Sequence, residues 1–271
     1  MKSTRELSVD NKLMEMVGGF GLSGKAVAAL KLMLDDEEIQ ASQEYANVVS
    51  IVRLGYNDHG PVHMRTVALN SVIMFDLLRK AGIKTSLEKD GCGDFEDSLT
   101  AVLIASMFHD LGMGMGRHNH ELHSTVLAMP IIDRLLAKVY DDSLNKRVMI
   151  RALALEGIAG HMGSISISSL EAGVVQVADG CDMTKGRARI PISLLHTPRV
   201  GHIHQYSANS IEEVRISAGA EKPVRVDVHM SSEVGLFQVE EVLLHKIANS
   251  TAKPHIELYA KVRDDEEKRY L

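Results

Sequence analysis

The strongest constraint on this chain is the ten-residue run LTAVLIASMF (99–108), which carries no charge and ends directly in His109 and Asp110. So apolar a run predicts a helix buried on every side, and its end therefore lies inside the protein. The turn that follows (111–116) holds three glycines, which leave the backbone close to whatever binds there. Imidazole and carboxylate groups in such a place lose their hydration, which costs free energy unless something binds them, and these residue types favour a metal ion.

Three more histidines, His118, His120 and His123, follow at the start of the next predicted helix. His120 and His123 are three positions apart and therefore share one face of that helix. We expect His123 to be a metal ligand, whereas His120 fits a ligand and a buried core histidine equally well. His118, nearest the turn, is expected at the surface or in contact with a substrate.

Further candidate ligands lie far from this segment. His63 falls in the first turns of a helix expected to begin near Pro61, and taken alone it fits a hydrogen-bonded core histidine better than a ligand. His161 follows a predicted helix in the segment GHMG, which presents it to a cavity. Asp179 ends the apolar run VVQVAD, where a carboxylate without a partner would be costly, and Asp182 lies on nearly the same face.

Basic residues follow these aspartates closely. Lys185, Arg187 and Arg189 form a cationic cluster that could hold a phosphate group. For Lys185 and Arg189 an ordinary basic end of a helix is an equally good interpretation.

The hydrophobic pattern changes near residue 200. Up to that point the apolar residues recur with helical periodicity. The remainder has two segments in which apolar and polar residues alternate, then an amphipathic helical segment and a further alternating segment, which predicts a β-β-α-β order. We therefore expect a mainly α protein with a helical domain and N-terminal helical extension (1–195) and a small α+β domain (200–271) ending in a solvated tail. Because so small a sheet has edges that need covering, we expect it to pack on a neighbour or to form a homodimer through this domain.

Net charge, cysteine content and the lengths of the apolar runs indicate which partners and which compartment to expect. The net charge of -6 argues against nucleic acid, which needs a basic surface. Two cysteines outside any CxxC pair fit a reducing cytoplasm, and the chain starts without the apolar core of a secretion signal. No apolar run approaches the ~20 residues that cross a bilayer. A cytoplasmic protein without membrane contact is expected.

Taken in order, His63, His109-Asp110 and Asp179 resemble the HD superfamily of metal-dependent phosphohydrolases. The resemblance rests on HMRTVA (63–68), the FHDLGMG run and VADGCDMTKGR (177–187), and it covers roughly residues 50–190. It implies an HD-domain helical bundle and a phosphohydrolase. The GYP tripeptide of the cyclic-dinucleotide phosphodiesterase branch is absent, so that substrate is not indicated.

Extra histidines are similar to those of the two-metal HD subtypes. In that pattern one histidine follows the glycine turn in an HS or HP dipeptide, here His123-Ser124, and others end a later helix, here His161. The usual doubled histidine is single in this chain, so His120 or a water would fill its position.

The resemblance implies a ligand set and a reaction. One or two divalent ions (Mn, Fe, Co or Zn) suit imidazole and carboxylate ligands, and hydroxide bound to the metal would attack a phosphomonoester or phosphodiester, with a nucleotide as the expected substrate. The first ion would be held by His63, His109, Asp110 and Asp179. Asp110 would bridge to a second ion held by His123 and His161, with His120 as a further candidate. The phosphoryl charge would be neutralised by Lys185, Arg187 or Arg117.

Two other functions remain open from the sequence. One is a sensor that binds a nucleotide without turning it over and passes the signal through the C-terminal domain. The other is an HD-fold oxygenase with a di-iron centre, which needs the same kinds of ligand.

Overall fold

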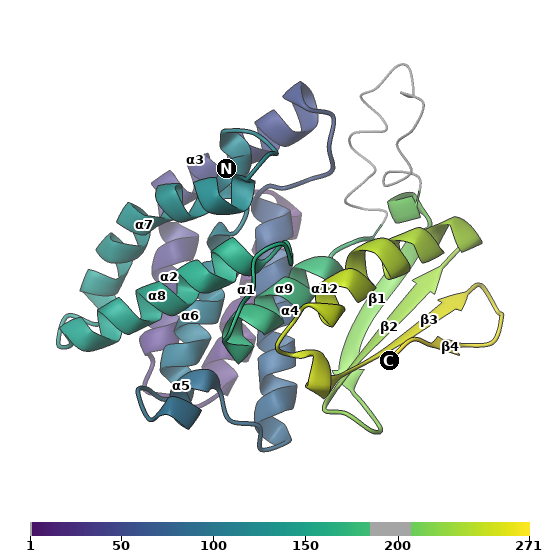
Figure 1. The fold of residues 1–271 in the computed structure, drawn as a ribbon. Coiled ribbons are helices and arrows are strands. Elements are labelled where there is room, and N and C mark those ends of the chain that lie inside the picture. Colours follow the sequence, from purple (N-terminus) through teal and green to yellow (C-terminus); the bar gives the residue numbers. More distant parts are fainter. Residues whose placement is uncertain (1, 185–206) are drawn as a thin grey trace.

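The structure, a computed structural model, describes residues 2–184 and 207–271. A bundle of helices is followed by a small sheet and its helical segment (Figure 1), which confirms the predicted mainly α protein with a C-terminal α+β part. The helices of the bundle are α1 (Thr4–Gly19), α2 (Lys25–Asp35), α3 (Glu37–Val48), α4 (Pro61–Lys80), α5 (Ser86–Asp90), α6 (Phe95–Phe108), α7 (His120–Val139), α8 (Leu144–Gly160) and α9 (Leu170–Cys181). The C-terminal part contains β1 (Ile211–Ala218), β2 (Val224–Met230), α12 (His245–Ala248), β3 (Ile256–Val262) and β4 (Lys268–Arg269).

The helix α6 forms the centre of the bundle, as its apolar sequence predicts. Every one of its residues is buried, and it contacts α2, α4, α8 and α9. Its start is fixed by a reciprocal cap, in which the backbone N–H groups of Asp94 and Asp97 each donate to the other's carboxylate. Its far end delivers His109 and Asp110, which are 0% and 2% exposed. The pair therefore sits in the interior, where its charge needs a partner.

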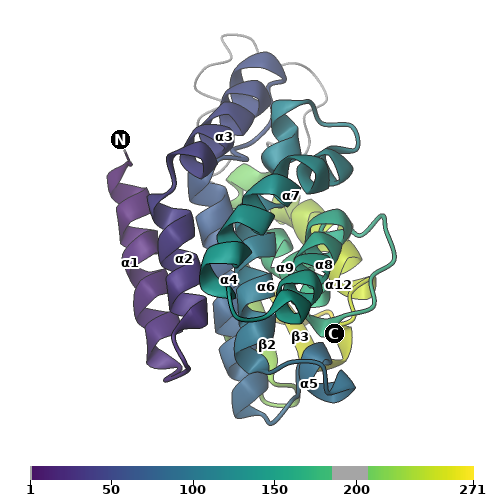
Figure 2. The ribbon, with the colours of Figure 1, turned by 90° about the vertical axis from the view of Figure 1, so that its left-hand side faces the viewer.

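A buried arginine ties the N-terminal helices to α4. Arg65 is 1% exposed, and its Nε donates to Asp10 Oδ1 on α1 at 2.7 Å. Its Nη1 and Nη2 donate to Gln43 Oε1 and Gln40 Oε1 on α3, both at 2.9 Å. Because α4 also carries His63, these contacts brace a candidate ligand helix. In Figure 2, α1 and α2 lie side by side as the outer layer of this region.

Replacing Asp10 with alanine should lower the free energy of unfolding by about 3 kcal/mol, because it removes the nearer of the two carboxylates that pair with the buried Arg65 charge. Denaturant unfolding measures this loss. The matched control is Asp76→Ala, which breaks a pair with the 71% exposed Lys80 and should cost about 0.5 kcal/mol or less. Equal losses in the two variants would contradict the anchoring role of Arg65.

The C-terminal sheet has the order β1-β2-β3-β4. β1 and β2 are antiparallel, β2 and β3 are parallel, and the helical segment crosses between them. The predicted strands are all present. Two details differ from prediction: the tail contributes the short strand β4, which pairs with β3, and the predicted amphipathic helix is π-helical over Gln238–Leu244 before α12.

The C-terminal part packs against the helical bundle of its own chain. β1 and β2 contact α4, while the π-helical stretch and α12 contact α9. The neighbour that the sheet was expected to need is therefore the bundle itself, and dimer formation stays a prediction. The predicted domain boundary between 195 and 200 lies outside the described residues. Within the described part of the chain, no helix combines the length and the hydrophobicity required to span a membrane.

Candidate metal centre

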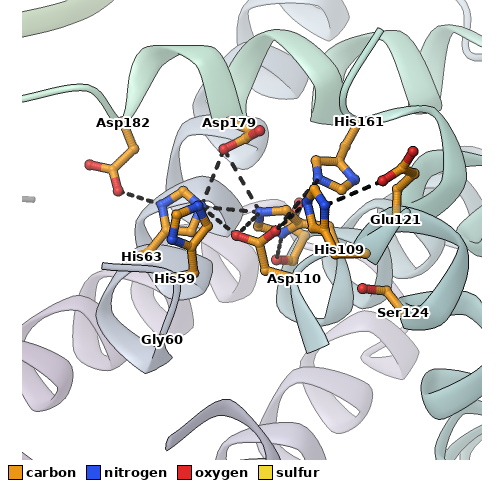
Figure 3. Close-up of polar contacts among 12 residues, drawn as sticks. His59, Gly60, His63, His109, Asp110, Glu121, Ser124, His161, Asp179 and Asp182 are labelled. Carbon is orange, nitrogen blue, oxygen red and sulfur yellow. Dashed lines mark hydrogen bonds and ion pairs between the residues drawn. The ribbon is translucent and has the colours of Figure 1, made fainter. Parts of the chain in front are cut away.

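Six of the predicted site residues, delivered by five helices, meet at one place. Figure 3 labels His63, His109, Asp110, His161 and Asp179 there. All six are buried, with at most 6% exposed. Each lies at a helix end, where neighbouring side chains can turn toward a common centre. They are His63 in the first turn of α4, His109 and Asp110 just after α6, His120 at the start of α7, His161 just after α8 and Asp179 in the last turn of α9.

The first half of the centre surrounds one oxygen of Asp110. Asp110 Oδ2 lies 3.3 Å from His63 Nε2 and 3.3 Å from His109 Nε2. Asp179 Oδ1 approaches the same two nitrogens, at 3.2 Å and 3.8 Å. Two imidazoles and two carboxylates thus point their donor atoms at one small volume.

The second half surrounds the other oxygen of the same carboxylate. Asp110 Oδ1 lies 3.2 Å from His120 Nε2 and 3.5 Å from His161 Nε2. The two nitrogens are themselves 3.2 Å apart. Asp110 therefore stands between two histidine pairs and turns one oxygen to each.

Hydrogen bonds behind the four imidazoles fix which nitrogen faces the centre. Carbonyl and carboxylate oxygens only accept, so in each ring Nδ1 carries a hydrogen, and in the neutral ring Nε2 then presents its lone pair inward. Outer partners of this kind orient metal-binding histidines. The Nδ1 contacts are His63 to Asp182 Oδ2 (2.7 Å), His109 to the carbonyl of Ser106 (2.9 Å), His120 to that of Arg117 (2.9 Å) and His161 to that of Ile158 (2.7 Å).

These convergent lone pairs fit a bound cation. His63 Nε2 and His109 Nε2 are 3.1 Å apart, and two such lone pairs repel each other unless a cation lies between them. Nitrogens held about 2.1 Å from one ion at a right angle are about 3.0 Å apart, so the observed spacing suits shared coordination. Three overlapping groups could hold an ion: His63, His109 and Asp110; His109, His161 and Asp179; Asp110, His120 and His161.

The protonation states also suit a cation. Burial by itself would raise the pKa of Asp110, but the positive charge that His109 and His59 carry when protonated, with hydrogen bonds from His109 and His120, holds that pKa well below its usual range. Burial likewise opposes ionisation of Asp179, yet Lys246 and His63 keep its pKa well below the ordinary value. Burial lowers the pKa of His161 to about 3, against the opposing effect of Asp110. At neutral pH both carboxylates are therefore ionised and His161 is neutral, so none of the three must lose a proton to bind an ion.

The structure places His120 in the centre and His123 outside it. His123 joins none of the three groups among the described residues, because it lies one turn further along α7 and is rotated about 60° from His120. The neighbouring Ser124 has a structural role, since its Oγ accepts a hydrogen bond from Gly112 N at 2.8 Å. A side chain at Gly112 would overlap the backbone of His120 and Ser124. The glycine turn thus lets α7 approach closely enough for His120 to reach Asp110.

Of the predicted phosphate-binding residues, Arg117 lies beside the centre. Its Nη1 is 3.4 Å from His120 Nε2 and 3.5 Å from His59 Nε2, and it lines a cavity of about 600 Å³ that Asp110 also lines. His118 is exposed, as expected. The roles of Lys185 and Arg187 stay predictions, because both lie outside the described residues.

Two residues that contact the candidate ligands, Asp182 and Lys246, were not predicted from the sequence as part of the site. The sequence predicts that Asp182 lies near the face of Asp179, but it gives no sign of the hydrogen bond between Asp182 and His63. Lys246 on α12 is 6% exposed and forms an ion pair with Asp179 Oδ2. The only signal for Lys246 is a lysine within an amphipathic pattern, which ordinarily indicates a solvated position.

Comparison with known proteins gives one informative relative. "Uncharacterized protein MJ1020" of Methanocaldococcus jannaschii is 40% identical over 233 residues, which are 86% of this chain and 88% of that protein. No family model and no solved structure matches the chain. The chain therefore belongs to the family of "Uncharacterized protein MJ1020".

Proposed function

We propose that this protein is a metal-dependent phosphohydrolase of the HD type, which cleaves a phosphomonoester or phosphodiester and has a nucleotide as its substrate class. One observation carries the proposal: the Asp110 carboxylate turns Oδ2 to His63 and His109 and Oδ1 to a second histidine pair. A carboxylate shared by two ions needs this arrangement, which is common to many enzymes that hydrolyse phosphate esters.

The chain's own residues divide into two ligand sets that share Asp110. By their distances, His63, His109 and Asp179 would hold one ion, and His120 and His161 the other. A divalent ion here would lower the pKa of water from 15.7 to roughly 7 and so supply hydroxide at neutral pH. The protein contributes orientation through the partners of each Nδ1 atom and holds the ligand side chains in buried positions beside the cavity.

The surroundings suit an anionic ligand of moderate size. The adjoining cavity of about 600 Å³ falls in the ~300–1,000 Å³ range of small-molecule sites. Arg117 lines that cavity, and its guanidinium can bind phosphate oxygens in pairs. These features support a phosphate ester as the substrate in preference to a neutral molecule.

Metal dependence and hydrolysis are tested together. Protein purified without added metal is subjected to elemental analysis, then stripped with a chelator and reloaded separately with Mn, Fe, Co or Zn. Hydrolysis of p-nitrophenyl phosphate, bis(p-nitrophenyl) phosphate and a panel of nucleotides is followed in each state. We expect close to two ions per chain, no turnover in the stripped protein and recovery after reloading.

Other results would replace the proposal. Nucleotide binding by the reloaded protein without turnover would favour the sensor function. Oxygen consumption by a reduced, iron-loaded sample, without phosphate release, would favour the di-iron oxygenase.

A further inference from the structure

The C-terminal part of the chain reaches the metal centre through one buried lysine. Lys246 pairs with Asp179 Oδ2, while Asp179 directs its other oxygen, Oδ1, at His63 Nε2 at 3.2 Å. We propose that Lys246 is a phosphate-binding residue of this site, so that the C-terminal part completes the active site. The inference rests on the proposed function in taking a ligand that bears a phosphate group.

The position of Lys246 is fixed by the helix that carries Asp179. Gly173, Gln176 and Gly180 lie on one face of α9 and receive the C-terminal segment. Gln176 Nε2 donates to the carbonyl of Lys246 at 3.1 Å, and Ser250 Oγ donates to the carbonyl of Gly173 at 2.9 Å. A Cβ atom at Gly180 would lie only 3.2 Å from Lys246 Cδ. The small residues of α9 therefore admit Lys246 to a defined place beside Asp179.

Lys246 also lines the cavity that adjoins the centre. Asp110, Asp179 and Arg117 line the same cavity, so a ligand in it meets both cationic side chains and the metal-binding carboxylates. Glu241 lines it too, but this side chain is exposed, and solvent weakens its repulsion of an anion. The buried part of the cavity is therefore flanked by two cations.

Charge balance explains why a buried lysine belongs next to such a centre. Among the described residues, five carboxylates (Asp110, Asp179, Asp182, Glu121 and Glu241) oppose Lys246 and Arg117, which leaves three net negative charges when the imidazoles are neutral. One divalent ion leaves one negative charge in this group, and the second ion of the proposed centre makes the balance positive. Asp179 must then share its charge between an ion and the ammonium, and a buried cation needs a compensating anion. A phosphate group in the cavity supplies that anion.

The test measures binding of inorganic phosphate to Mn-loaded protein by isothermal titration calorimetry. Lys246→Gln keeps a hydrogen-bond donor for Asp179 but removes the charge, Lys246→Met removes both, and Lys246→Arg restores the charge. Lys253→Met is the matched control, because Lys253 lies on the same segment and is exposed. Elemental analysis of every variant verifies that the metal content equals that of the wild type.

Phosphate affinity should fall by about tenfold or more in Lys246→Gln and Lys246→Met, recover in part in Lys246→Arg and stay unchanged in Lys253→Met. Undiminished phosphate affinity in Lys246→Gln, with full metal content, would overturn the inference. Loss of metal in Lys246→Gln and Lys246→Arg alike would also overturn it, since Lys246 would then only support Asp179. If phosphate binding depends on Lys246 but the protein hydrolyses no ester, the inference stands and the hydrolase function is rejected. If the protein hydrolyses an ester but Lys246→Gln binds phosphate as the wild type does, the hydrolase function stands and the inference is rejected.

Discussion

Asp110→Asn should abolish phosphoester turnover, with a loss of roughly a thousandfold or more, or about 4 kcal/mol of transition-state stabilisation. The side chain keeps its size, but its amide nitrogen cannot ligate the ion that the lost oxygen faced. Because Asp110 turns one oxygen to each histidine pair, both ligand sets are weakened by this one change. Elemental analysis should show a loss of metal alongside the loss of turnover.

The loss of turnover in Asp110→Asn is compared with the losses in two control variants. Asp182→Asn alters only the outer partner of His63 and should cost about 10- to 100-fold. Asp133→Asn changes an exposed carboxylate paired with Arg151 and should leave activity unchanged. Circular dichroism should show all three variants folded, as the substitutions are isosteric. Full activity in Asp110→Asn with normal metal content would remove Asp110 from the reaction.

The neighbourhood of Asp110 could be predicted because its sequence permits few structures. A run of ten uncharged residues has no polar face to turn to solvent, and α6 is buried at every position. His63, by contrast, lies 46 positions before His109. Periodicity alone does not connect two helices, so its partnership with His109 depended on the resemblance to the HD superfamily. The observed contacts between His63, His109 and Asp179 agree with that resemblance.

Lys246 could not be predicted, and the reason is physical. It follows Asp179 by 67 positions, and its burial arises when α12 packs on the glycine face of α9. Amphipathic periodicity shows which face of a helix is apolar but not which polar residue meets a partner from another element. The same limit applies to Asp182, whose oxygen reaches His63 only because the chain leaves the helical conformation after α9.

The choice between His120 and His123 depended on where α7 begins. The sequence predicts a start near His118, whereas the structure begins α7 at His120, after Asn119 in the left-handed conformation with φ of 53°. Periodicity does not show such a residue, although asparagine adopts this conformation more readily than most. With this start, the His120 ring bonds back to the carbonyl of Arg117 and turns Nε2 inward.

His120→Ala and His123→Ala should therefore behave differently, even though both remove an imidazole from the same face of α7. His120→Ala takes away one of the two histidines that face Asp110 Oδ1. Its metal content should fall by about one ion per chain, and turnover should drop by more than the ~100-fold that loss of an outer partner costs. His123→Ala removes a half-buried ring that belongs to none of the ligand groups, so metal content and turnover should stay close to those of the wild type.

Parallel elemental analysis and turnover measurements on the two variants decide between the arrangements. The opposite pattern, with metal lost only in His123→Ala, would mean that α7 is rotated so that His123 replaces His120 beside Asp110. That rotation would also move Ser124 away from Gly112, whose backbone N–H donates a hydrogen bond of 2.8 Å to the Ser124 hydroxyl in the observed arrangement. Ser124→Ala provides an independent check: in the observed arrangement it weakens the anchor of the glycine turn and should lower stability by about 1 kcal/mol, whereas in the rotated one it should have little effect.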